Sequence, residues 1–170
     1  MGFKRGWGLF LALLLGFSCT AVADDNVENA RKLFAAQEYK EAIKILKKTT
    51  KESPANVEAW MLLGDCYGGL GKNEDAIESY QQSVRIDPKN TDALLRLGVT
   101  YAAERKHANA IEAYQMVIGI QPENPEAHFY LGVVYDRVGR IGQAFEEYKI
   151  LKTLDEGLAD KLYEIILGSG

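Results

Sequence analysis

Apolar residues recur along this chain with the spacing of amphipathic helices. One stripe occupies positions i, i+3, i+4 and i+7 of a helix and consists of Trp60, Leu63, Gly64 and Tyr67. A second stripe follows after Gly71 and consists of Ala76, Ile77, Tyr80 and Val84. Gly71 is suited to end the first helix, and Pro88 stops the second. The pattern therefore predicts a pair of helices joined by a short turn.

The same pair returns at a fixed step of 34 residues. The positions that keep this step are Gly64, Gly98 and Gly132; Tyr67, Tyr101 and Tyr135; Ala76, Ala110 and Ala144; and Tyr80, Tyr114 and Tyr148. A period of this length is typical of stacked helical units that bury their apolar faces only against one another. The repeats predict an all-α array.

Turn residues and small residues keep the same register. Each of Pro54, Pro88 and Pro122 is followed two residues later by an asparagine, which is a favourable N-cap. A glycine inside a helix costs roughly 1 kcal/mol relative to alanine. We therefore expect the repeated glycines to mark close helix contacts, with the alanines and tyrosines of the second helices packed around them.

The run Trp60-x-x-Leu63-Gly64-x-x-Tyr67, followed by Ala76, Tyr80 and Pro88, resembles the tetratricopeptide repeat (TPR) family. The resemblance implies a right-handed α-solenoid with units at 57–90, 91–124 and 125–158 and a degenerate unit at 23–56. Because Asn26 and Asn29 replace large apolar residues, we expect the first helix of that unit to be short or frayed. Residues 158–170 resemble a C-terminal capping helix, with Leu158, Leu162, Ile165 and Ile166 on one face and a frayed Gly-Ser-Gly tail.

The N-terminal 23 residues have a different character. Lys4 and Arg5 precede an uncharged stretch from Gly6 to Ala23, and Ala21-Val22-Ala23 has the small residues of a cleavage site. This three-part pattern predicts a secretory signal peptide at 1–23 and a periplasmic or secreted protein. The alternatives are an uncleaved membrane anchor, or lipidation at Cys19, which the bulky Phe17 disfavours.

Charge and cysteine content narrow the function further. Without Lys4 and Arg5 the chain holds 18 basic and 24 acidic residues, a net charge of −6, which argues against nucleic-acid binding. The densest basic cluster, Lys44, Lys47, Lys48 and Lys51, is interpreted as a solvated helix face. Cys66 has no partner for an internal disulfide after export. It is predicted to be a small buried apolar residue, with an intermolecular thiol role as the alternative.

Catalytic patterns are missing from the sequence. His107 is expected in an exposed turn, and His128 replaces Trp60 and Leu94 of earlier units, which predicts a partly buried packing role. The sequence has no Cys–His pair, no His-x-x-x-His spacing and no phosphate-binding loop. We therefore expect neither an enzyme nor a cofactor or metal site.

In TPR proteins the first helices of successive repeats line a concave groove, and the resemblance implies the same here. The predicted partner-binding residues are Met61, Asp65, Leu95, Arg96, Val99, Phe129, Tyr130, Val133 and Arg137. Their apolar members would form a strip edged by charge, although neighbouring repeats are expected to bury part of it if the strip serves only packing. A ligand with apolar anchors and flanking basic residues would suit this groove. A carboxylate-terminus clamp would not, because Arg96 is the one basic residue at the corresponding places.

The sequence therefore predicts a non-enzymatic scaffold that binds a partner peptide or protein in its groove, in the assembly or secretion of an envelope complex. The alternative is a structural TPR protein that associates with itself into homo-oligomers. The sequence leaves the identity of the partner open.

Overall fold

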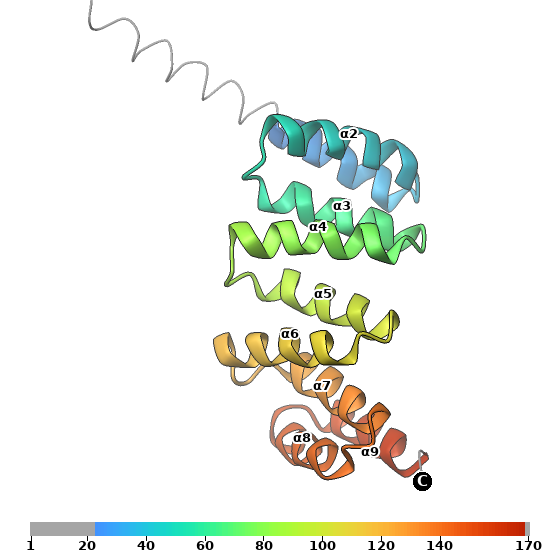
Figure 1. The fold of residues 1–170 in the computed structure, drawn as a ribbon, viewed down its shortest axis with the longest axis vertical. Helices are drawn as coiled ribbons and strands as arrows, with labels where there is room; N and C mark the ends of the chain where they lie inside the picture. The colour runs from blue at the N-terminus through green and yellow to red at the C-terminus, as the bar shows by residue number, and fades with distance from the viewer. Residues whose placement is uncertain (1–22, 169–170) are drawn as a thin grey trace, which may run out of the picture. The chain divides into compact units, whose positions relative to one another are not determined.

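The computed structural model describes residues 23–168, and every regular element in that range is an α-helix. These helices form two compact units, which meet between Lys72 and Asn73. Unit 1 contains a helix at residues 23–35, α2 (Tyr39–Glu52) and α3 (Val57–Gly69). Unit 2 contains α4 (Asn73–Ile86), α5 (Thr91–Ala103), α6 (His107–Ile120), α7 (Pro125–Arg137), α8 (Ile141–Leu154) and α9 (Glu156–Gly168) (Figure 1). The predicted all-α fold class is confirmed.

Three predictions fall partly or wholly outside the described residues. The signal peptide, apart from Ala23, and the lipidation site at Cys19 lie there, and so do Ser169 and Gly170 of the tail. Among the described helices, none combines the length and the apolar character that crossing a membrane requires.

The helices begin at the same step of 34 residues that the sequence keeps. First helices start at residues 23, 57, 91 and 125, and second helices at residues 39, 73, 107 and 141. The expectation that the first helix is short or frayed is wrong, since residues 23–35 are helical throughout. Ala23, Val27 and Ala30 are buried, so they supply the apolar stripe that Asn26 and Asn29 do not.

Side-chain caps fix where the first helices begin. The side-chain oxygens of Asn56, Asn90 and Asn124 accept hydrogen bonds from backbone N–H groups three residues later, at 2.8, 2.9 and 2.9 Å. The predicted N-caps are therefore confirmed. The Asp155 carboxylate caps α9 in the same way by accepting from the Leu158 N–H at 3.0 Å. This cap starts α9 at Glu156, two residues before the predicted boundary.

The first helices end in a common turn. After α3, the Lys72 N–H donates to the Tyr67 carbonyl and the Gly71 N–H to the Gly68 carbonyl, both at 2.9 Å, which is the Schellman pattern. Gly71 has φ +69°, as this turn requires. The equivalent residues Gln37, Arg105 and Gly139 have φ 61°, 57° and 75°. Two of the four turns thus hold a side chain in the left-handed region, which favours glycine.

Glycines at the helix interfaces behave differently in successive repeats. A Cβ at Gly98 would lie 2.5 Å from Cε1 of Tyr114, so the predicted glycine–tyrosine packing holds between α5 and α6. A Cβ at Gly132 would instead meet Leu162 at 2.5 Å and Glu147 Cβ at 3.3 Å. The expectation that Tyr148 fills this space is wrong, because α9 packs against both α7 and α8 and places Leu162 there.

His128 is buried, as predicted, and it is also hydrogen-bonded through both ring nitrogens. Its Nδ1 lies 2.7 Å from the Glu147 carboxylate of α8, and its Nε2 lies 2.9 Å from the Pro122 carbonyl oxygen. Two repeats earlier, Trp60 Nε1 donates to the Pro54 carbonyl at the same distance. His107 is not in an exposed turn: it is the first residue of α6 and is half-buried, because the helix starts there.

Cys66 is fully buried in α3, as predicted. Burial removes its thiol from water, and the nearby Asp65 carboxylate disfavours a second negative charge. Together they raise the pKa of the thiol to about 12. The thiol is therefore neutral and unreactive in the folded protein.

Candidate functional site

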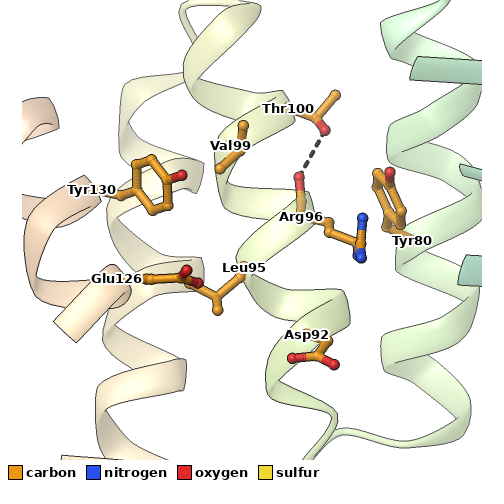
Figure 2. Close-up of a pocket in the computed structure, with 8 residues that line it drawn as sticks. All are labelled: Tyr80, Asp92, Leu95, Arg96, Val99, Thr100, Glu126 and Tyr130. Atoms are coloured by element: carbon orange, nitrogen blue, oxygen red, sulfur yellow. Dashed lines mark hydrogen bonds between the residues drawn. The ribbon is translucent and has the colours of Figure 1, made fainter. Parts of the chain in front are cut away.

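A hollow of about 350 Å³ opens in unit 2 between α4, α5 and α7. Its lining combines apolar, aromatic and charged side chains (Figure 2): Tyr80, Asp92, Leu95, Arg96, Val99, Thr100, Glu126 and Tyr130. Most of them come from α5, whose outward face is exposed between the neighbouring helices. The hollow has the lower range of volume expected of a ligand pocket.

The floor of the hollow is apolar. Leu95 is nearly covered, at 9% exposure, whereas Val99 one turn later is 41% exposed. Figure 2 shows Tyr130 of α7 across from Val99 of α5. Val99 and Tyr130 thus offer contact surface to a ligand, while Leu95 supports them from below.

The position of Tyr130 is fixed by two other aromatic rings. It stacks on the buried Tyr114 at a centroid distance of 5.7 Å and an interplanar angle of 19°, and Phe129 meets its edge at 5.5 Å. Burial, with the neighbouring Tyr130 as a smaller cause, raises the pKa of the Tyr114 hydroxyl well above its usual range. Tyr114 therefore remains a neutral base for the stack, and Tyr130 is a preorganised contact.

The rim of the hollow is charged. Asp92 and Glu126 lie 34 residues apart in the first turns of α5 and α7, and both are exposed. The Arg96 side chain extends toward the ring of Tyr80 (Figure 2). The Thr100 hydroxyl donates to the Arg96 backbone carbonyl at 2.7 Å, so its proton is committed to the helix. Two carboxylates face one guanidinium, which gives the rim a negative balance.

This arrangement can hold a segment that presents an apolar group to the floor and a cation to the acidic rim. Arg96 can donate to a carbonyl or carboxylate of the same segment. Among residues 23–168, no three His, Cys, Asp or Glu side chains group as metal ligands would. The geometry is that of a binding surface.

The structure brings some of the predicted site residues together and leaves others apart. Leu95, Arg96, Val99 and Tyr130 line the hollow. The remaining predicted residues of unit 2 are Phe129, which contacts Tyr130, and Val133 and Arg137 farther along α7. Val133 is half-buried and Arg137 is exposed. The other two, Met61 and Asp65, are half-buried on α3 of unit 1.

Sequence reasoning missed two lining residues, Tyr80 and Thr100. Tyr80 had been assigned to helix packing because it belongs to the repeated tyrosines. A step of 16 residues joins Tyr80 to Arg96 and Tyr114 to Tyr130, so each second-helix tyrosine is paired with a side chain on the next first helix. That spacing was the signal available in the sequence.

Several solved structures share this fold. The structure titled "Crystal structure of MamA protein" is 27% identical, with a TM-score of 0.75, and the match covers 86% of this chain and 85% of that chain. YrrB, titled a TPR protein with an unusual peptide-binding site, is 18% identical with a TM-score of 0.74 over 85% of this chain and 74% of its own. The first TPR of Spaghetti (RPAP3), bound to the HSP90 peptide SRMEEVD, is 26% identical with a TM-score of 0.66 over 69% and 93%.

A search of curated protein sequences gave no match. The sequence does fit the family description "Cytochrome c-type biogenesis protein H TPR domain" over residues 21–157. Most of the chain is covered by this match, and the solved neighbours are TPR proteins. The fold is that of a TPR protein-interaction scaffold. The chain belongs to the family of the cytochrome c-type biogenesis protein H TPR domain.

Proposed function

We propose that this protein is a non-enzymatic scaffold that holds a segment of a partner protein in the hollow of unit 2. The observation that carries the proposal is the apolar floor of Leu95, Val99 and Tyr130 beneath an acidic rim. Burying an apolar side chain there contributes on the order of 1.5–3 kcal/mol. A few such anchors suffice for micromolar binding after the costs of association.

The ligand segment has apolar anchors flanked by basic residues. Asp92 and Glu126 favour a cation at the N-terminal ends of α5 and α7, while Arg96 takes a carbonyl or carboxylate of the same segment. The remaining predicted residues extend the contact: Phe129, Val133 and Arg137 along α7 and Met61 and Asp65 on α3.

The process served is the assembly of an envelope complex. The family name refers to cytochrome c-type biogenesis, which supports a role in maturation or assembly rather than in metabolism. The expected signal sequence supports export to the periplasm. On this view the chain follows the division drawn from its sequence: a signal peptide, four TPR units and a cap.

Site-specific photocrosslinking in the native host tests the location of the site. A photoreactive residue replaces Val99, which lines the hollow, or Val138, which has similar exposure (37%) but does not line it. We expect a defined partner segment to crosslink at residue 99 and not at residue 138. Identical crosslinking at both positions would contradict a site in the hollow.

Self-association is the second candidate function. Apolar side chains of unit 2 that do not line the hollow are also exposed, among them Ile141, Ile150 and Leu167 at 38, 39 and 61%. Light scattering over a range of concentrations separates the two functions. A strict monomer at high concentration would contradict the homo-oligomer.

A further inference from the structure

The outer face of α2 carries an uninterrupted stripe of lysines. Lys40, Lys44, Lys47, Lys48 and Lys51 are all exposed, and at 3.6 residues per turn they occupy a sector of about 100°. The opposite face of α2 is buried in unit 1. These five residues are called the lysine stripe below.

The lysine stripe is hardly neutralised by neighbouring acids. Lys48 lies 3.9 Å from Glu52 and both side chains are largely exposed, so this pair is weak. Within residues 23–168 the other four lysines make no ion pair. Lys40 and Lys44, Lys44 and Lys48, and Lys47 and Lys51 are like charges four residues apart, which destabilises a helix. The stripe thus opposes the stability of the helix that carries it.

The repeats provide an internal comparison. The equivalent positions of α4 hold Glu74, Glu78, Gln81, Gln82 and Arg85, one base among acids and amides. The equivalent positions of α6 and α8 include a single lysine, Lys149. The repeat scaffold therefore does not require lysine at any of these places, and the stripe is particular to the first unit.

Charge is also divided unevenly along the chain. Residues 23–72 hold eight basic and eight acidic residues, whereas residues 73–168 hold 10 basic and 16 acidic residues. The excess negative charge thus belongs to unit 2, and unit 1 concentrates its positive charge on one helix face. Charge asymmetry of this kind favours contact with an extended anionic surface.

We propose that the lysine stripe docks unit 1 on an anionic lipid surface. Clusters of four to eight basic residues on a helix face are attracted to acidic phospholipids. The stripe lies fewer than twenty residues after the uncharged stretch from Gly6 to Ala23, which has the composition of a membrane-targeted segment. Nucleic acid is a poorer fit, because the stripe has neither arginine for bidentate phosphate contacts nor an aromatic residue for base stacking.

Vesicle flotation of the full chain tests this inference. Vesicles of phosphatidylcholine alone are compared with vesicles that also contain about one third phosphatidylglycerol, so that insertion of the N-terminal segment affects both equally. Each lysine near an anionic surface strengthens binding about fivefold. We expect the triple variant Lys44→Gln, Lys47→Gln, Lys51→Gln to lose on the order of 100-fold in partition onto the anionic vesicles and nothing on the neutral ones.

The matched control is Lys72→Gln, Lys89→Gln, Lys161→Gln, which removes the same charge from exposed lysines elsewhere. It should lose less than tenfold, and Lys44→Arg, Lys47→Arg, Lys51→Arg should keep the binding. Circular dichroism should find the stripe variant folded, since its like-charge pairs are relieved. Equal losses for stripe and control variants would overturn the proposal. So would wild-type protein that binds both vesicle types equally, or that prefers duplex DNA to anionic vesicles through the same lysines.

Discussion

The ring of Tyr114 lies so close to Gly98 that a Cβ at residue 98 would be 2.5 Å from its Cε1 atom. This contact sets the approach of α5 to α6, and Tyr114 in turn supports Tyr130 at the hollow. The glycine that the repeat keeps at this place is therefore linked by packing to the candidate site.

Gly98→Ala tests that link. Tyr114 is buried and has no free space to move into, so overpacking should outweigh the gain in helix propensity. We expect a loss of about 1–2 kcal/mol in the free energy of unfolding, measured by urea titration. Gly119→Ala is the control, because a Cβ at that exposed helical glycine would meet nothing within 4 Å. It should be neutral or stabilising by up to about 1 kcal/mol, and equal effects of the two variants would refute the packing role.

Arg105→Gly should stabilise the protein. Arg105 occupies the left-handed position of the turn after α5 with φ 57°, where a side chain costs roughly 1–2 kcal/mol. Part of the gain is offset by the greater backbone entropy of glycine in the unfolded chain, which leaves about 0.5–1 kcal/mol. Thermal melting should show a higher midpoint. The reverse change, Gly139→Ala at φ 75°, should lower it, and a lower midpoint for Arg105→Gly would be the contrary result.

The pair of His128 and Glu147 predicts a nonadditive double substitution. His128→Leu leaves the Glu147 carboxylate and the Pro122 carbonyl without their partner and should cost about 2 kcal/mol. In the preceding repeat the two equivalent positions hold Leu94 and Ala113, both buried. The double variant His128→Leu, Glu147→Ala copies that repeat, so it should be more stable than the two single losses combined. A double-mutant cycle measures this, and strict additivity would argue against coupling.

Cys66 should resist thiol reagents in the folded protein. With a pKa of about 12, its thiolate fraction at pH 8 is about 1,000 times smaller than at the ordinary value of 9.0. A Cys19→Ser background isolates Cys66, and labelling with a chromogenic disulfide should be at least 100-fold slower in buffer than in urea. Labelling at similar rates would mean that α3 is open in solution.

The same shift has a consequence for stability. Because the folded pKa of Cys66 is raised above 9.0, the stability gained by burying the neutral thiol is complete below about pH 9. It is lost as the pH rises from 9 toward 12, since the unfolded chain releases the proton first. Cys66→Ala should unfold with a weaker dependence on pH in that window, and an unchanged dependence would count against the buried thiol as its source.

The repetitive part of the fold could be predicted from the sequence because its determinants are local. Asn56, Asn90 and Asn124 cap helices through their own side chains, and the apolar stripes have the helical period. The exceptions depend on tertiary contacts. Leu162 replaces Tyr148 beside Gly132 because α9 begins at an aspartate cap that lies outside the 34-residue register.

The candidate site could be predicted only in part. Arg96, Val99 and Tyr130 were expected from the first-helix stripes, and they line the hollow. Tyr80 was not, because a second-helix residue reaches the hollow only through the packing of α4 on α5. Leu95 has the right position, but its burial makes it part of the floor, and a charged substitution there would test folding rather than binding.

The most direct test of the central claim is the affinity of the partner segment identified by crosslinking. Isothermal titration of a synthetic peptide of that segment compares wild type with Val99→Lys and Val138→Lys, two variants with the same chemistry and similar exposure. We predict that Val99→Lys weakens binding at least tenfold, which corresponds to about 1.4 kcal/mol, and that Val138→Lys stays within twofold. Equal affinities for all three proteins would contradict a binding site in the hollow of unit 2.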